Sequence, residues 1–231
     1  MPKLIRVSPS IIAIDYKNDE VLDKALVNIE KAGANFVHLD VMDGVFVKNK
    51  TFDYTLVDKI RDKTNLMLDV HLMVENPDEV IDKYIDAGAD ILTIHYEATK
   101  NLTQTLKKIK ESNVVTGIAI NPKTPALKIK DILEQKLVDI VLVMGVKPGA
   151  CGQEFIPGMA EKIAEIRDLD KHVLIEIDGG VTVKNSKILR KMGANIIVSG
   201  KTVFESKNMR KTIKQLKGKD ILGNISKFFK N

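Results

Sequence analysis

The sequence predicts an α/β fold, a single (β/α)8 TIM barrel spanning residues 1–231, with a terminal helix or frayed tail from about residue 215. Three observations carry this prediction: eight short apolar runs, charged segments with helical spacing between them, and a repeated motif at the predicted helix ends. A chain of 231 residues, 44% of them hydrophobic, is long enough for one compact domain of the larger size.

The apolar runs are rich in β-branched residues and have the length of buried strands. They lie at 4–8, 36–41, 66–74, 91–96, 114–120, 139–146, 173–178 and 195–200. Between them lie charged segments that carry Leu and Ile at helical spacing, such as 18–33 and 76–88. Strands that alternate with helices imply a parallel sheet covered by helices.

A weak internal repeat sets the number of units. The segments KAGAN (31–35), DAGAD (86–90) and KMGAN (191–195) each end a helical pattern with a glycine, at Gly33, Gly88 and Gly193. Their steps of 55 and 105 residues correspond to two and four units of roughly 27 residues, which is the size of a βα unit in an eight-fold barrel. A doubly wound open sheet is the alternative, but no G-x-G-x-x-G follows the first strand.

Composition argues against several classes of function. The formal charge of +5 comes from lysines spread through the helical segments, and only 5% of residues are aromatic, so we expect no nucleic-acid partner. No run reaches the roughly 18 apolar residues of a membrane span, and the first residues lack the pattern of a signal peptide. With one cysteine, Cys151, no disulfide can form within the chain. We therefore expect a cytoplasmic protein without a membrane partner.

Histidines and carboxylates gather at the carboxyl ends of three predicted strands. Side chains two residues apart share a face of a strand, so His38 pairs with Asp40 and Asp69 with His71, while Asp178 ends the seventh strand. Active groups of such barrels lie at this rim. Nitrogen and oxygen ligands in this mixture suit one divalent ion, either zinc, iron, manganese or cobalt.

Other polar residues of these segments have simpler interpretations. Asp43 precedes Gly44 and is expected to shape a turn or support its neighbours. Asp69 is expected to support a ligand rather than bind the ion itself. His95 either faces the site or is a core histidine, and His172 falls before a strand, at the opposite rim.

Glycine-rich loops follow the sixth, seventh and eighth runs, in KPGACGQEF (147–155), DGGVTVKN and SGKTVF (199–204). Barrels of this kind often bind phosphate with the last two of these loops, and Gly179, Gly180 and Gly200 fit that role, with Lys201 beside them. Tight turns also need glycine, so each loop has a purely structural alternative. Met42, Met73 and Met144 lie at strand ends as candidate pocket walls, or else they fill gaps in the core.

Taken together, these motifs resemble the ribulose-phosphate 3-epimerase family. The resemblance runs from about residue 5 to 205 and rests on VSPSIIAID, VHLDVMDGVFV, LDVHLMVENP, AGADILTIHYEA, INPKTP, VMGVKPGACGQEFIPGM, EIDGGV and IIVSGKTVF. It implies a ribulose-phosphate-binding barrel that converts D-ribulose 5-phosphate to D-xylulose 5-phosphate in the pentose phosphate pathway, through an enediolate and with one divalent metal ion. It further implies a phosphorylated ketose substrate and self-association.

The resemblance also assigns residues. The implied metal ligands are His38, Asp40, His71 and Asp178, and the implied acid/base pair is Asp40 and Asp178. The implied substrate and phosphate contacts are Ser10, His71, Gly149, Ala150, Cys151, Gly152, Gly179, Gly180, Gly200 and Lys201.

Departures from the family pattern leave undecided which phosphorylated sugar is the substrate. Ala150 and Cys151 replace glycine and an aromatic residue, Lys201 replaces serine, and VKNKTFDY replaces a proline-bearing segment after the second strand. The allulose-6-phosphate 3-epimerase is the first alternative. Related decarboxylase and aldolase barrels carry Asp-x-Lys-x-x-Asp, which the stretch from Asp40 to Asp43 lacks. A non-catalytic sugar-phosphate-binding barrel would not need both carboxylates.

Overall fold

The computed structural model describes residues 4–218 and contains eight parallel strands in one sheet. They are β1 Arg6–Ser8, β2 Phe36–Met42, β3 Met67–Met73, β4 Ile91–His95, β5 Val115–Ile120, β6 Ile140–Met144, β7 Leu174–Asp178 and β8 Ile196–Val198. Each lies within or next to one of the predicted runs. The last is shorter than predicted, because Gly200 caps the following helix rather than extending the strand.

The sheet curls until its two edges meet. Its strand order, β1-β8-β7-β6-β5-β4-β3-β2, brings β1 and β2 to the two ends of the hydrogen-bonded series. These edges are joined by the parallel bridge between Ser10 and His38 and by backbone hydrogen bonds from Asn35 N to Val7 O (2.9 Å) and from His38 N to Pro9 O (3.0 Å). The chain therefore forms the predicted (β/α)8 TIM barrel.

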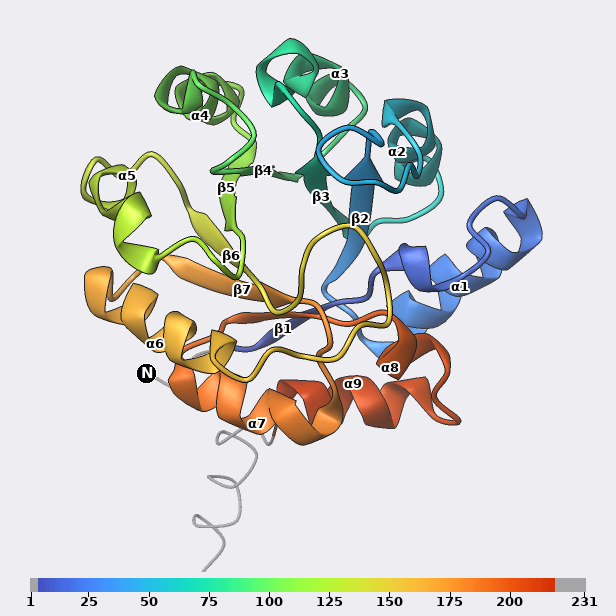
Figure 1. Cartoon of the computed structure of the whole chain (residues 1–231). Coiled ribbons are helices and arrows are strands. Elements are labelled where there is room, and N and C mark those ends of the chain that lie inside the picture. Colours follow the sequence, from blue (N-terminus) through green and yellow to red (C-terminus); the bar gives the residue numbers. More distant parts are fainter. Residues whose placement is uncertain (1–3, 219–231) are drawn as a thin grey trace, which may run out of the picture.

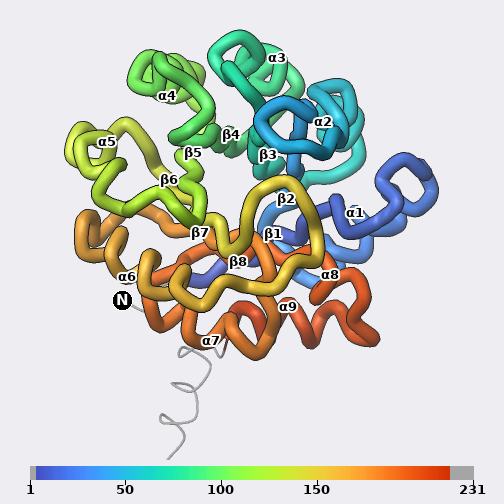
Figure 2. Tube along the Cα trace, in the orientation of Figure 1, coloured from blue at the N-terminus to red at the C-terminus, as the bar shows by residue number. Residues whose placement is uncertain are grey.

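Helices surround the barrel on the outside (Figure 1), and Figure 2 traces the same ring of alternating elements. Within residues 4–218 the α-helices are α1 Asp19–Ala32, α2 Tyr54–Arg61, α3 Ile81–Asp86, α4 Leu102–Glu111, α5 Lys130–Glu134, α6 Met159–Leu169, α7 Val183–Met192, α8 Lys201–Phe204 and α9 Met209–Lys217. Short 3-10 helices lie at Ile11–Ala13, Pro77–Glu79 and Ala126–Ile129. The tail predicted from about residue 215 falls on the last turn of α9 and, beyond it, outside the described residues.

The helix ends follow local sequence signals. Asn18 caps α1 because its side-chain oxygen accepts hydrogen bonds from the N–H groups of Glu20 and Val21. Gly33 and Gly193 end α1 and α7 with φ of 88° and 123°, backbone conformations that other residues rarely adopt. The repeated glycine thus stops these helices as the sequence predicts.

The barrel interior has an apolar floor and a polar upper part. Phe36, Ile91, Ile140 and Ile196, one from each even-numbered strand, form a layer of side chains at the amino ends of the strands. A larger apolar cluster fills the space between the strands and the surrounding helices. The buried acidic and histidine side chains of the strands lie after the first two positions of each strand, at His38, Asp40, Asp69, His71, His95 and Glu176.

Among residues 4–218, the helices are too short or too polar for any of them to cross a membrane.

Candidate active site

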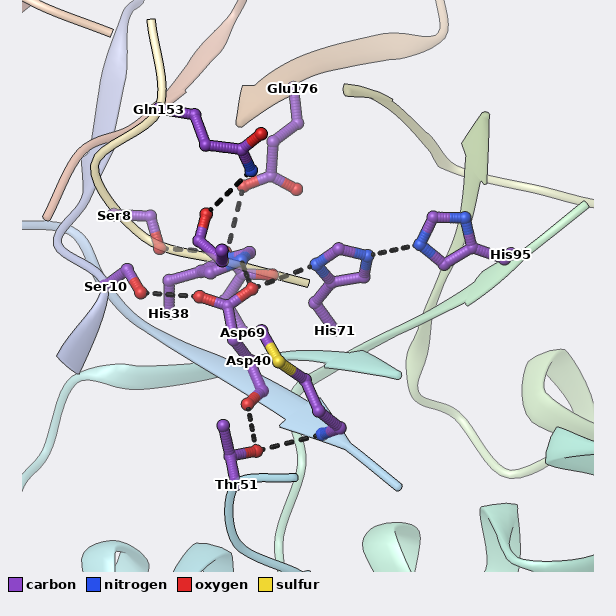
Figure 3. Close-up of polar contacts among 12 residues, drawn as sticks. Ser8, Ser10, His38, Asp40, Thr51, Asp69, His71, His95, Gln153 and Glu176 are labelled. Atoms are coloured by element: carbon purple, nitrogen blue, oxygen red, sulfur yellow. Dashed lines mark hydrogen bonds and ion pairs between the residues drawn. The ribbon is translucent and has the colours of Figure 1, made fainter. Parts of the chain in front are cut away.

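Strands β2 and β3 place two histidines and two carboxylates in register inside the barrel. His38 lies beside Asp69, and Asp40 lies beside His71. The Nδ1 atom of His38 is 2.7 Å from Asp69 Oδ2, and the Nδ1 atom of His71 is 3.2 Å from Asp40 Oδ1. All four side chains are buried, and Figure 3 shows the polar contacts among them. Each carboxylate therefore has an imidazole as its neighbour on the next strand.

Asp178, the last residue of β7, joins this group from a strand that is not adjacent to β2 or β3. His38, Asp40, His71 and Asp178 each offer one nitrogen or oxygen atom, and the four atoms lie within 4.8 Å of one another. Ser10 orients the central carboxylate, because its hydroxyl donates a hydrogen bond of 2.6 Å to Asp40 Oδ2. The four residues predicted as ligands thus converge on one point.

The hydrogen bonding of His38 fits a cation at this point. Its Nδ1–H donates to Asp69, whose Oδ2 also accepts from the Ser8 hydroxyl at 2.8 Å. Its other nitrogen, Nε2, is buried, lies 3.3 Å from Asp40 Oδ1 and has no hydrogen-bond partner among residues 4–218. A histidine that donates one N–H to a carboxylate and directs the free nitrogen at other ligands has the usual arrangement of a metal-binding histidine.

Electrostatics distinguish the two aspartates. Burial raises the pKa of Asp178 to about 7, and the nearby Asp40 carboxylate acts in the same direction. Burial alone would raise the pKa of Asp40 too, but His38 and His71 lower it well below its usual value. The same contacts act on His38, since burial lowers its pKa while Asp69 and Asp40 together raise it well above its usual value. The two carboxyl groups therefore differ strongly in their affinity for a proton.

A cavity of about 460 Å³ opens above these residues, within the size range of small-molecule sites. Asp40 and Asp178 lie in its wall, whereas His38 and His71 lie beneath it, fully buried. The other predicted contact and wall residues that line the cavity are Ser10, Met42, Met73, Met144, Gly149, Ala150, Cys151, Gly152, Gly179, Gly180, Gly200 and Lys201. Of the predicted substrate contacts, only His71 is absent from this lining.

Comparison with known sequences decides the family. The model of the ribulose-phosphate 3 epimerase family matches residues 6–204. The chain belongs to the ribulose-phosphate 3-epimerase family. The ribulose-phosphate 3-epimerase of Bacillus subtilis is 40% identical over 220 residues, which cover 93% of this chain and 99% of that protein. The chloroplastic ribulose-5-phosphate-3-epimerase of Arabidopsis thaliana is 40% identical over 219 residues, or 92% and 76% of the two chains. The expected isomerase family is confirmed.

Solved structures agree on the architecture. The crystal structure of 3-hexulose-6-phosphate synthase from Salmonella typhimurium matches with a TM-score of 0.69 over 92% of this chain and 97% of that one. At 12% identity, this likeness concerns the barrel fold alone.

Two glycines of this epimerase-family chain permit close approaches at the rim of the cavity. A Cβ atom on Gly180, whose φ is 65°, would lie 2.5 Å from the backbone nitrogen of Phe155. A Cβ atom on Gly152, whose φ is 82°, would lie 2.5 Å from the Lys201 Nζ atom. Lys201 therefore lies against the loop after β6. Backbone contact and positive φ favour glycine at 180, whereas at 152 the positive φ alone does, because the lysine side chain can move.

Asp43 supports the loop in which it lies. Asp43 Oδ1 accepts hydrogen bonds from the N–H groups of Val45 (2.8 Å) and Phe46 (2.9 Å), and its Oδ2 accepts one from Glu75 N (2.8 Å). Asp43 thus shapes its own turn and ties it to the loop after β3. Asp69 Oδ2 lies 2.7 Å from His38 Nδ1 and so contacts one of the expected ligands, a partner that sequence reasoning did not name.

Sequence reasoning missed Glu176. This residue lies two positions before Asp178 on β7, is fully buried, and places Oε1 4.0 Å from His38 Nδ1. Burial and the Asp69 carboxylate raise its pKa well above the usual value. The rule that relates Asp69 to His71 would have found Glu176, because both carboxylates lie two residues before a site residue on the same strand.

The sequence did not decide whether His95 is a core histidine or faces the site. The ring is fully buried, yet its Nε2 lies 2.9 Å from His71 Nε2 (Figure 3). Burial, together with the neighbouring His71, lowers the pKa of His95 to about 4 despite the opposing effect of Glu97. His95 is therefore a core histidine that contacts the site.

Proposed function

We propose that this protein converts D-ribulose 5-phosphate to D-xylulose 5-phosphate by inverting carbon 3. The observation that carries the proposal is the pair of carboxylates, Asp40 from β2 and Asp178 from β7, in the wall of one cavity above two buried imidazoles. The names of the curated relatives support the same reaction.

His38, Asp40, His71 and Asp178 are the residues we assign to one divalent cation. Two nitrogen and two oxygen donors within 4.8 Å suit zinc, iron, manganese or cobalt, and the free Nε2 of His38 supports this assignment. When bound, the cation supplies Lewis-acid stabilisation of negative charge that develops on the substrate.

Asp40 and Asp178 act as the acid and the base. Inversion requires that a proton leaves carbon 3 on one face and returns on the other, through an enediolate. Carboxylates from two non-adjacent strands can reach the two faces of a substrate bound between them, and they exchange roles when the reaction reverses. Ser10 holds Asp40 in place through its 2.6 Å hydrogen bond.

The glycine-rich loops in the cavity lining are suited to the phosphate group. Gly179, Gly180 and Gly200 present backbone there, the loop from Gly149 to Gly152 closes one side, and Lys201 supplies a positive charge. Met42, Met73 and Met144 form the apolar wall. Ala150, Cys151 and Lys201 are the departures from the family pattern, and for that reason allulose 6-phosphate is the substrate to compare. Cytoplasmic location and self-association remain predictions.

Turnover in deuterium oxide tests the proposal. We expect the purified protein, supplied with Mn²⁺, Co²⁺, Zn²⁺ or Fe²⁺ in turn, to form xylulose 5-phosphate and to introduce deuterium at carbon 3, which proton NMR detects. Allulose 6-phosphate is measured in parallel under the same conditions. A higher rate with allulose 6-phosphate would reassign the substrate, and absence of exchange with both sugars would exclude an epimerase.

A further inference from the structure

A chain of buried polar groups leads away from His71. His71 from β3 and His95 from the end of β4 are both fully buried, with ring centroids 5.0 Å apart and ring planes at 30°. The two Nε2 atoms are 2.9 Å apart (Figure 3), so one of them must carry a hydrogen and the other must accept it. On its far side, His95 Nδ1 lies 3.3 Å from Glu97 Oε2.

When both rings are neutral, the acceptor at the Glu97 end fixes the positions of the hydrogens along this chain. Glu97 accepts hydrogen bonds from Asn121 N (3.0 Å) and from the Thr124 hydroxyl, so its carboxylate acts as an acceptor toward His95 Nδ1–H as well. The neutral His95 ring then accepts at Nε2, and His71 must donate from its own Nε2–H. His71 Nδ1, which faces Asp40 at 3.2 Å, is left with its lone pair free.

The far end of the chain is anchored to a fixed loop. Asn121 and Thr124 belong to the loop after β5, and Lys162 of α6 donates to the carbonyl oxygens of Asn121 (3.0 Å), Pro122 (2.7 Å) and Thr124 (2.7 Å). Lys162 is only 6% exposed, so its three hydrogen bonds hold the loop from inside the protein. Glu97, with a side chain 24% exposed, is therefore held on rigid neighbours.

We propose that Glu97 is a positioning residue that acts through His95 to fix the ring orientation and the Nε2–H tautomer of His71, which leaves Nδ1 free to bind the divalent cation. This inference rests on the cation site of the proposed function. Metal-binding histidines commonly donate their second N–H directly to a carboxylate, and loss of that partner typically costs 10–100-fold in metal affinity. Here a second imidazole is inserted between the ligand and the carboxylate.

Metal affinity of Glu97→Gln tests the role directly. We expect Co²⁺ to bind about 10-fold more weakly than to the unmodified protein, in competition with a chromophoric chelator. In long-range proton–nitrogen spectra of the Zn²⁺-loaded protein, His71 should carry its hydrogen on Nε2, and Glu97→Gln should lose this single tautomer. Thr124→Val removes one hydrogen-bond donor to Glu97 and should cause a smaller loss of Co²⁺ affinity. This second variant tests the role if Glu97→Gln does not fold.

Asp90→Asn is the matched control. The Asp90 carboxylate also accepts from a backbone N–H, that of Leu68 (2.8 Å), and from a side chain, that of Arg61 (2.9 Å), but it lies before β4 rather than after it. Its Co²⁺ affinity should be unchanged. If folded Glu97→Gln or Thr124→Val keeps the Co²⁺ affinity and the His71 tautomer of the unmodified protein, the positioning role of Glu97 is wrong. The cation site itself would still stand. Failure of the unmodified protein to bind Co²⁺ would overturn the cation site, and this inference with it.

Discussion

At the scale of single residues, the site is organised around Asp40. Its two carboxylate oxygens meet the Ser10 hydroxyl at 2.6 Å, His71 Nδ1 at 3.2 Å and His38 Nε2 at 3.3 Å. Asp178 has no comparable set of neighbours and owes its raised pKa mainly to burial. The two aspartates thus differ: His38 and His71 lower the pKa of Asp40, whereas burial raises the pKa of Asp178 to about 7.

Asp178→Asn should strongly slow epimerisation while the barrel still folds. The amide keeps the shape and an oxygen ligand but cannot transfer a proton, so we expect kcat to fall by about 10²–10⁴-fold. Asp40 remains able to act on one face. For that reason, one of the two epimers should still exchange its carbon 3 hydrogen with deuterium oxide, without inversion.

The control for this substitution is Asp139→Asn. Asp139 lies immediately before β6, at the amino end of the barrel, where it binds Lys110 and the N–H of Thr116. Metal content is measured in the same samples, because Asp178 is also an assigned ligand. A full epimerisation rate in Asp178→Asn would remove this residue from the acid/base pair.

The alternation of side chains along a strand predicts much of the site. It does not predict contacts between side chains of different strands. The period of two along a strand relates His38 to Asp40 and Asp69 to His71, and parallel strands bring their carboxyl ends to one rim. The contact between His71 and His95 depends on ring orientation and on the lateral packing of β3 against β4. The spacing of residues along one strand predicts neither the ring orientation nor the packing between two strands.

At the scale of elements, two loops meet across the mouth of the barrel. The loop after β2 reaches toward the long loop after β6, which arches across the barrel in Figure 1. Asn49 Nδ2 donates a hydrogen bond of 2.7 Å to Gly149 O, and a Cβ atom on Gly149 would lie 2.9 Å from Val47 Cβ. The strands could be predicted from local pattern, whereas this contact joins residues 100 positions apart.

Asn49→Ala should loosen the loop at 147–154 without affecting the chemistry. An exposed hydrogen bond contributes about 0.5–1.5 kcal/mol, which corresponds to a 2- to 12-fold rise in KM if the loop must close over the substrate. The value of kcat should stay the same, and limited proteolysis should cleave the loop faster. Asn101→Ala, in the exposed loop after β4, is the control. A KM equal to that of the unmodified protein would show that the contact does not hold the loop.

At the scale of the whole molecule, the assigned ligands come from three strands. β2 and β3 are neighbours, whereas β7 is separated from β2 by β8 and β1. Within residues 4–218, His38 Nε2 and both carboxylate oxygens of Glu176 are buried and have no hydrogen-bond partner. A cation bound at the ligands would therefore join distant parts of the sheet.

Divalent cations should accordingly stabilise the entire barrel. An ion that binds the folded chain alone adds roughly 4 kcal/mol to the free energy of unfolding at a free concentration of 1,000 times Kd. For a protein of this size, 1 kcal/mol raises Tm by about 2–4 °C, so the expected shift is roughly 8–16 °C. Calorimetric scans of chelator-treated protein with and without Co²⁺ measure it, and His71→Gln should lose most of the shift. An equal Tm with and without the ion, at concentrations that support turnover, would mean that the ion is not held by residues of three strands.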